Sequence, residues 1–70
     1  MKLNSPEMRN LVNEALDKIK DDVLGKYFSE KTIEDAFNGE VYAMSMVSDL
    51  LLYLGKYKET SMWREAIEIN

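Results

Sequence analysis

The sequence predicts an all-α protein, a small bundle of three or four helices that is dimeric through its third helix and C-terminal segment. Three observations lead to this prediction. Apolar residues of the N-terminal half recur every three or four positions, which is the period of an amphipathic helix. Residues 41–57, VYAMSMVSDLLLYLGKY, are apolar with little polar relief. Isolated glycines stand between the segments of helical pattern, where helices commonly end.

The first predicted helix begins after Ser5, a favourable N-cap residue that is followed by Pro6 at the first helical position. We expect this helix to continue to Val23 and to stop at Gly25, because glycine commonly terminates helices. Its apolar stripe consists of Met8, Leu11, Val12, Ala15, Leu16, Ile19 and Val23.

A second, shorter helix is predicted over residues 30–37, with Ser29 as its cap and Asn38-Gly39 as its end. Asn-Gly is also a strong signal for a β-hairpin. Two strands over residues 32–37 and 40–47 are therefore the alternative within the 29–47 region. Helix-favouring residues on both sides of the turn, among them Glu, Ala, Met and Leu, favour the helices.

The third predicted helix runs from about Glu40 to Tyr53 or Tyr57, and Gly55 helps to end it. Its polar stripe is short and contains only Ser45, Ser48, Asp49 and Lys56. A helix that is apolar nearly all round is normally buried on most sides, and the other short helices of this chain cannot surround it. We therefore expect its surplus apolar surface to pack against a second copy or another protein.

The C-terminal residues 60–70, TSMWREAIEIN, predict a fourth helix capped by Thr60 or Ser61. Met62, Trp63, Ala66 and Ile67 would form its inner face. No linker, repeat or low-complexity segment interrupts the chain, so residues 1–70 are expected to form a single helical domain. A core of this size contributes only about 3–5 kcal/mol of stability, which makes association with a second copy useful.

The composition argues against catalysis. The 70 residues include no cysteine and no histidine, so disulfides, thiolate zinc sites and the commonest general base at neutral pH are excluded. The three glycines are isolated and do not form a phosphate-binding loop. We expect no enzymatic activity, no cofactor and no metal site.

The charge and hydropathy of the sequence limit which partners and which cellular location we expect. Thirteen acidic and nine basic side chains give a net charge of −4, and the basic residues are scattered. We therefore do not expect nucleic acid as a partner, because proteins that bind it present a basic stripe to the phosphates. The longest apolar run, residues 50–54, is far shorter than the roughly 20 residues that span a bilayer. We expect no membrane association and a cytoplasmic location, or the host cytoplasm for a phage-encoded protein.

Two sets of side chains are candidates for contacts with a partner. Tyrosine, tryptophan and methionine are enriched in protein interfaces, and the C-terminal half is rich in them. The predicted interface residues are Met46, Leu52, Tyr53, Tyr57, Met62 and Trp63. A second set forms a predicted acidic face that would imitate a row of phosphates and occupy a basic groove: Glu14, Asp17, Asp21 and Asp22.

These observations favour a small, non-enzymatic regulatory protein that acts through protein–protein interaction, such as an adaptor or an inhibitor of the kind that phages and prophages encode. The apolar and aromatic patch would bind the partner protein. The alternative is a small dimeric transcriptional or nucleic-acid-associated regulator. That alternative requires six basic residues to converge on one surface: Lys18, Lys20, Lys26, Lys56, Lys58 and Arg64.

Overall fold

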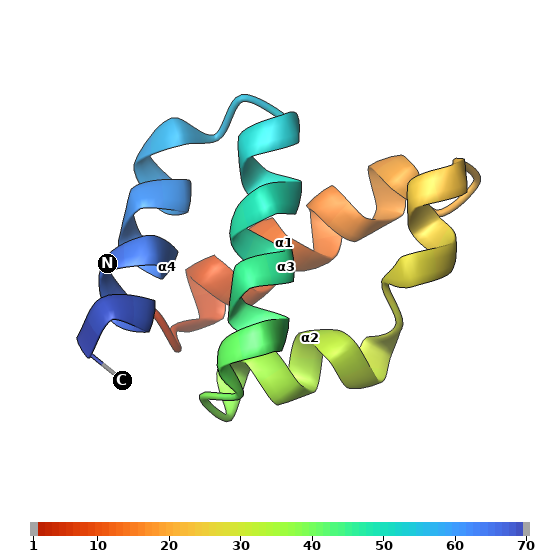
Figure 1. Ribbon diagram of the computed structural model, residues 1–70. Coiled ribbons are helices and arrows are strands. Elements are labelled where there is room, and N and C mark those ends of the chain that lie inside the picture. The colour runs from red at the N-terminus through yellow and green to blue at the C-terminus, as the bar shows by residue number, and fades with distance from the viewer. Residues whose placement is uncertain (1, 70) are drawn as a thin grey trace.

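The computed structural model describes residues 2–69, which form four α-helices and one short 3₁₀-helix (Figure 1). These elements are α1 (Pro6–Ile19), η1 (Val23–Tyr27), α2 (Glu30–Phe37), α3 (Val41–Tyr53) and α4 (Tyr57–Ile69). The all-α prediction is confirmed. No strand occurs between residues 2 and 69, so the hairpin alternative at Asn38-Gly39 is wrong.

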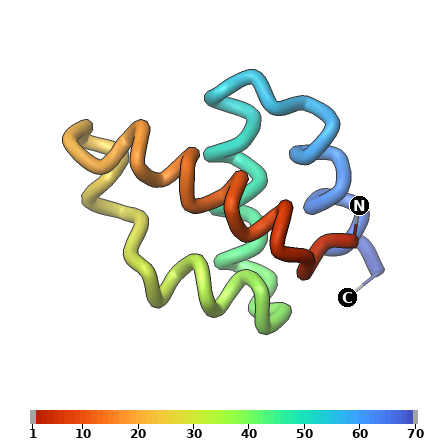
Figure 2. Tube along the Cα trace, turned by 180° about the vertical axis from the view of Figure 1, so that it is seen from behind, coloured from red at the N-terminus to blue at the C-terminus, as the bar shows by residue number. Residues whose placement is uncertain are grey.

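Helix α3 stands at the centre of a small bundle. Figure 1 shows α4 beside it and running in the opposite direction, with α2 crossing near its first turns. Viewed from behind in Figure 2, α1 lies across α3. Three helices therefore cover α3 from different sides, and one side of it is left without a neighbouring helix.

Helix α1 starts where the sequence predicts and ends earlier. The Ser5 hydroxyl accepts a hydrogen bond from the backbone N–H of Met8 at 3.1 Å, but the helix stops at Ile19 rather than at Val23. The reason is local, because the Asp22 carboxylate accepts the backbone N–H of Val23 at 2.6 Å and thereby caps η1. Val23 is exposed and contributes nothing to the core.

Gly25 lies inside η1 instead of ending α1. Its backbone approaches the end of α1 so closely that an added Cβ would lie 2.7 Å from the carbonyl oxygen of Lys20. Real Cβ atoms do not come that close to backbone atoms, so only glycine allows the chain to fold back on itself here.

Helices α2 and α3 follow the predicted bounds closely. The Ser29 hydroxyl caps α2 by accepting the backbone N–H of Thr32 at 3.2 Å. The Glu40 carboxylate caps α3 by accepting the backbone N–H groups of Tyr42 and Ala43, at 3.1 and 2.8 Å. Each helix is followed by a glycine with positive φ, 90° at Gly39 and 77° at Gly55, a conformation that side chains disfavour.

Helix α4 begins at Tyr57, so the predicted caps at Thr60 and Ser61 are wrong. The turn after α3 is tight, because the backbone N–H of Lys56 bonds back to the Leu51 carbonyl at 2.9 Å. The new helix starts directly after this bond. Thr60 is buried in the first turns of α4, and its hydroxyl donates to the Lys56 carbonyl at 2.8 Å.

The hydrophobic core draws on all four α-helices. Helix α3 supplies the largest share, and α1, α2 and α4 each present a narrower apolar side to it. The buried apolar residues are Met8, Val12, Ala15, Ile19, Ile33, Ala36, Phe37, Ala43, Met44, Val47, Leu50, Leu51 and Trp63.

Trp63 joins three helices at one end of this core. Its side chain is fully buried, and its ring meets Phe37 of α2 edge to face with centroids 5.1 Å apart. The indole N–H donates to the Met8 sulfur of α1 at 3.4 Å. The largest side chain of the chain therefore lies inside the protein with its one polar atom satisfied.

Replacing Met8 by Leu is predicted to lower the free energy of unfolding by about 1–2 kcal/mol. The change keeps most of the apolar volume but leaves the buried indole N–H without an acceptor. Chemical denaturation followed by the fluorescence of Trp63 measures the effect. Met62→Leu is the matched control, because Met62 is half-buried, and equal destabilisation by both changes would contradict this role of the Met8 sulfur.

Candidate functional site

The side of α3 that no other helix covers carries large exposed side chains. Tyr42, Leu52 and Tyr53 are 74%, 40% and 62% exposed. Together with Met46 and Asp49 they follow one another at three-, four- and seven-residue spacing, which places them on one side of a helix. We call these five residues the outer face of α3. Other positions of α3, such as Val47 and Leu51, are fully buried, so the outer face lies opposite the side of the helix that packs into the core.

The structure divides the predicted interface residues into three groups. Leu52 and Tyr53 lie on the outer face of α3, and Tyr57, which is 69% exposed, lies at the start of α4. Met46 and Met62 are half-buried. Trp63 is fully buried and its assignment to an exposed patch is wrong, because its ring fills the space between α1 and α2.

Tyr42 is an exposed residue of the outer face that the sequence prediction omitted. It lies seven positions before Asp49, so both residues belong to the polar stripe of the helix. A large aromatic residue within a polar stripe is a usable signal for exposed aromatic surface. The signal was hidden because Val41, Ala43 and Met44 surround Tyr42 in the sequence.

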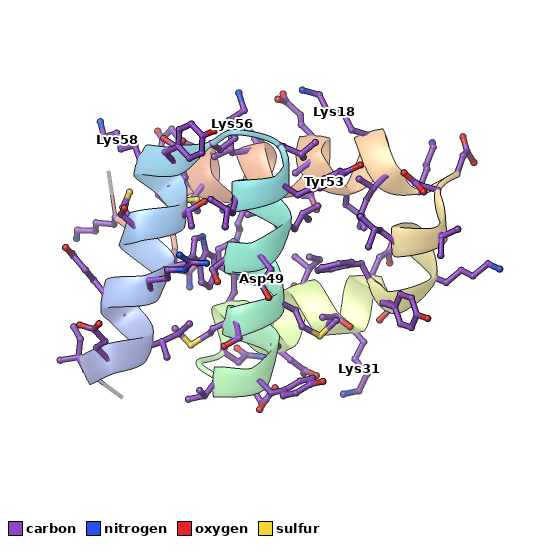
Figure 3. All side chains as sticks on the ribbon, turned by 45° about the horizontal axis from the view of Figure 1, so that its top comes forward. Lys18, Lys31, Asp49, Tyr53, Lys56 and Lys58 are labelled. Carbon is purple, nitrogen blue, oxygen red and sulfur yellow. The ribbon has the colours of Figure 1, made fainter. Side chains whose placement is uncertain are left out.

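Asp49 is the charged group at the centre of the outer face. Its side chain is 73% exposed and lies 3.6 Å from the guanidinium of Arg64 on α4, which is 51% exposed. In Figure 3, Asp49 points outward from α3, Tyr53 lies toward the C-terminal end of the same helix, and Lys56 lies beyond that end, in the connection to α4. An ion pair this exposed contributes little to folding, so both charges remain able to contact a partner.

The outer face is suited to contact rather than to reaction. Tyrosine presents an apolar ring and a hydroxyl that can donate or accept a hydrogen bond, and Leu52 adds apolar area. Within residues 2–69, no three acidic side chains come together in a way that could hold a metal ion. None of the helices in this range is both long and apolar enough to cross a lipid bilayer.

The predicted acidic face is divided by the early end of α1. Glu14 and Asp17 are exposed on the helix, whereas Asp21 and Asp22 lie beyond its last residue. Asp22 is also used to cap η1. The four carboxylates therefore do not form one regular row, because such a row requires all of them on a continuous helix.

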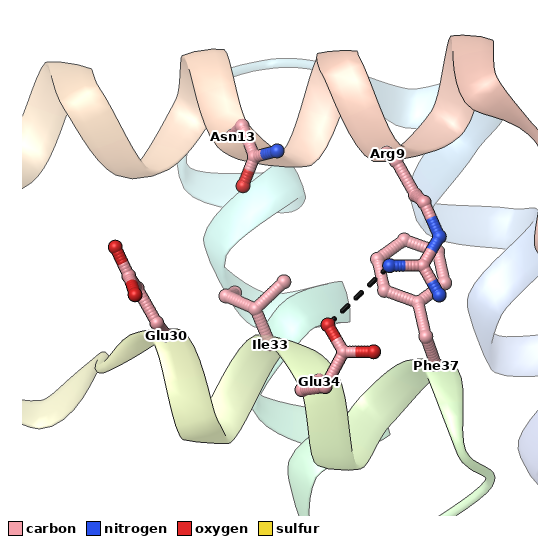
Figure 4. Close-up of a pocket in the computed structure, with 6 residues that line it drawn as sticks. All are labelled: Arg9, Asn13, Glu30, Ile33, Glu34 and Phe37. Atoms are coloured by element: carbon pink, nitrogen blue, oxygen red, sulfur yellow. Dashed lines mark hydrogen bonds and ion pairs between the residues drawn. The ribbon is translucent and has the colours of Figure 1, made fainter.

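A pocket of about 240 Å³ lies between α1 and α2 (Figure 4). The Arg9 guanidinium closes one end, lying 4.4 Å from the centre of the Phe37 ring and 3.4 Å from the Glu34 carboxylate. Ligand pockets usually measure about 300–1,000 Å³ and are mostly apolar, so this one is a small gap between two helices. The residues that line it are Arg9, Asn13, Glu30, Ile33, Glu34 and Phe37.

One ionisable group on α2 has a displaced pKa. Lys31 donates a hydrogen bond to the Asp35 carboxylate at 2.9 Å, and this bond, together with the negative charge, raises the pKa of Lys31 above its ordinary value. The pair joins residues four positions apart on an exposed helix face. It supports the short helix α2 and is separate from the outer face of α3.

Arg9→Ala is predicted to lower the free energy of unfolding by about 1–2 kcal/mol, and Glu34→Ala by less than about 0.5 kcal/mol. Arg9 covers the Phe37 ring as well as pairing with Glu34, whereas Glu34 takes part only in an exposed ion pair. Urea denaturation of both variants measures the difference. An equal loss would show that the ion pair, not the contact with the ring, links α1 to α2.

Comparison of the chain with protein-family models, with curated proteins and with solved structures gave no match. Its own surface and side chains are therefore the basis for a functional assignment.

Proposed function

We propose that this chain is a non-enzymatic interaction module, an adaptor or inhibitor that binds a partner protein through the outer face of α3. The observation that carries the proposal is the exposure of Tyr42, Leu52 and Tyr53 on one side of a helix whose opposite side is buried. Tyr57, at the start of α4, extends the exposed aromatic surface near the C-terminal end of α3.

The energetics of these side chains support binding. Burying one leucine-sized side chain contributes about 1.5–3 kcal/mol relative to leaving it in water. Two or three such groups equal the stability expected of a core this small. Tyrosine is enriched in interface cores, and the exposed Asp49–Arg64 pair provides charges that would orient a partner.

The proposal includes a cytoplasmic location, either in the cell that encodes the protein or, for a phage-encoded inhibitor, in the host. The chain has no cysteine and thus makes no use of the oxidising environment in which disulfides stabilise small secreted domains.

A second candidate function is a nucleic-acid-associated regulator. One observation favours it. In Figure 3, the side chains of Lys18, Lys56 and Lys58 all point toward the same edge of the molecule. Arg64, another of the six basic residues that this function requires, pairs with Asp49 instead. The basic surface is thus smaller than the function requires, and protein binding is the stronger proposal.

Leu52→Glu is predicted to reduce capture of the partner protein at least about tenfold, because it places a charge in the centre of the proposed contact. The tagged chain and the variant are used as baits in extract from the native cell, and binding is then measured with the purified partner. Asn10→Glu is the control, since Asn10 is an exposed residue of α1, which crosses the other side of α3. Similar thermal unfolding of both variants establishes that the fold is kept. Equal capture by both variants would contradict the proposal.

For the nucleic-acid candidate, fluorescence anisotropy of labelled duplex DNA is the direct measurement. A regulator that uses the lysine edge must bind more weakly as salt concentration rises, because phosphate contacts release counterions. Replacing Lys18, Lys56 and Lys58 together by alanine must reduce both the affinity and its salt dependence. We expect no salt-sensitive binding from the wild-type protein, and the opposite result would make the second candidate the better one.

A further inference from the structure

The turn between α2 and α3 contains the only Asn-Gly pair of the sequence. Both Asn38 and Gly39 are exposed, at the lower edge of the molecule in Figure 1, where α2 passes into α3. Glycine has no side chain to shield its backbone nitrogen, so the Gly39 nitrogen is a sterically accessible nucleophile for the side-chain amide of Asn38. The pair therefore makes Asn38 a candidate for deamidation.

Deamidation of Asn38 exchanges ammonia for water through a cyclic imide. The Gly39 nitrogen forms a bond to Cγ of Asn38, the bond from Cγ to Nδ2 breaks, and ammonia leaves with the proton that the Gly39 nitrogen carried. A water molecule then opens the ring. Hydrolysis of the bond from the Gly39 nitrogen to Cγ gives aspartate. Hydrolysis of its bond to the backbone carbonyl carbon gives isoaspartate, in which the main chain runs through Cβ and Cγ.

The folded turn keeps the two reacting atoms apart. The angle ψ of Asn38 is 0°, so the Gly39 nitrogen eclipses the backbone nitrogen of Asn38 and not Cβ, the atom that carries the carboxamide. Ring closure requires rotation about the bond from Cα to the carbonyl carbon until the Gly39 nitrogen reaches the side of Cβ. The conformation of the folded chain is therefore unreactive, although both residues are open to solvent.

Two backbone hydrogen bonds oppose this rotation. The N–H of Gly39 donates to the Ala36 carbonyl at 3.1 Å, and the N–H of Glu40 donates to the Asp35 carbonyl at 3.0 Å. Together they form a Schellman motif, a common way for a helix to end, and the first of them uses the nitrogen that would have to attack. Phe37, which precedes the turn, is buried in the core. Reaction at this site therefore requires the turn to open.

We propose that Asn38 is a deamidation site controlled by the opening of the turn between α2 and α3, so that aspartate and isoaspartate accumulate in proportion to the time that the chain spends open. The inference is independent of the proposed function, because it involves neither the outer face of α3 nor a partner protein.

The two products weaken the turn that protected the amide. Both add a negative charge beside the C-terminal carbonyl groups of α2, the end of a helix at which anions are unfavourable. Isoaspartate also adds one backbone atom to the loop that each Schellman hydrogen bond closes. A modified chain therefore opens more readily than an unmodified one, and the modification is a covalent record of earlier opening.

Mass spectrometry of the full chain at neutral pH follows the reaction, since the replacement of an amino group by a hydroxyl group raises the mass, and peptide mapping assigns the position. The folded chain is compared with the same chain unfolded in guanidinium chloride. We expect the folded chain to react at least about tenfold more slowly, because only the open fraction reacts. Asn38→Gln is the control, since its longer side chain must close a larger ring and the product at this position is expected to be lost.

Two further variants test the control by opening within the folded protein. Arg9 holds α1 against α2 through the Phe37 ring, so Arg9→Ala is expected to speed the reaction about 5–30-fold, in parallel with its loss of stability. Glu34→Ala removes only an exposed ion pair and is expected to change the rate by less than about threefold. Urea denaturation of the same samples gives the free energy of unfolding with which each rate is compared.

Equal rates in the folded and the unfolded chain would overturn the inference, because the turn would then give no protection. An unfolded chain that forms no product at position 38, or that is modified first at another asparagine, would overturn it as well. So would rates that fail to follow the measured order of stability of the wild type and the two variants. Slower reaction in the folded chain, with rates in that order, supports the inference whatever the outcome of partner capture.

Discussion

The burial of α3 is the constraint on which the rest of the structure depends. Its thirteen residues include only three with strongly polar side chains, Ser45, Ser48 and Asp49, so the helix is stable only with neighbours on most of its sides. Helices α1, α2 and α4 provide those neighbours, and the fully buried Trp63 fixes α4 to α1 and α2 through its contacts with Met8 and Phe37. Helix α2, with only eight residues, depends strongly on packing because helices that short are unstable in isolation.

Three short helices cannot enclose a fourth completely, and the side that remains open is where functional surface is expected. Tyr42, Leu52 and Tyr53 are exposed there, while the pocket between α1 and α2 is small and its Arg9 and Glu34 neutralise each other. The charged residue of α3, Asp49, is also exposed on this side. The charges of Asp49 and its partner Arg64 keep this surface compatible with water. They also make it electrostatically asymmetric, because the negative charge is on α3 and the positive charge is on α4.

The sequence predicts the elements whose signals are local. Ser5, Ser29 and the Asn38-Gly39 turn mark helix ends correctly because caps and positive-φ glycines act within a few residues. The sequence does not predict the end of α1, since Val23 fits the apolar period but a competing cap at Asp22 redirects the chain.

The start of α4 and the place of Trp63 are beyond local signals as well. Threonine is a residue type that commonly caps helices. Thr60 nevertheless lies inside α4, because the tight turn that follows α3 lets the helix begin three residues earlier, at Tyr57. The position of Trp63 depends on Met8, 55 residues away, and neither periodicity nor composition reveals such a contact. For the candidate site, the helix was predicted correctly, but which of its large side chains are exposed depends on where the neighbouring helices lie.

A protein that bound the outer face of α3 would have to match its apolar and its charged groups at the same time. Leu52 and Tyr53 would require an apolar group, and the exposed Asp49–Arg64 pair would require polar or charged groups beside it. Because Asp49 belongs to α3 and Arg64 to α4, the packing of these two helices fixes the chemistry that such a protein must present.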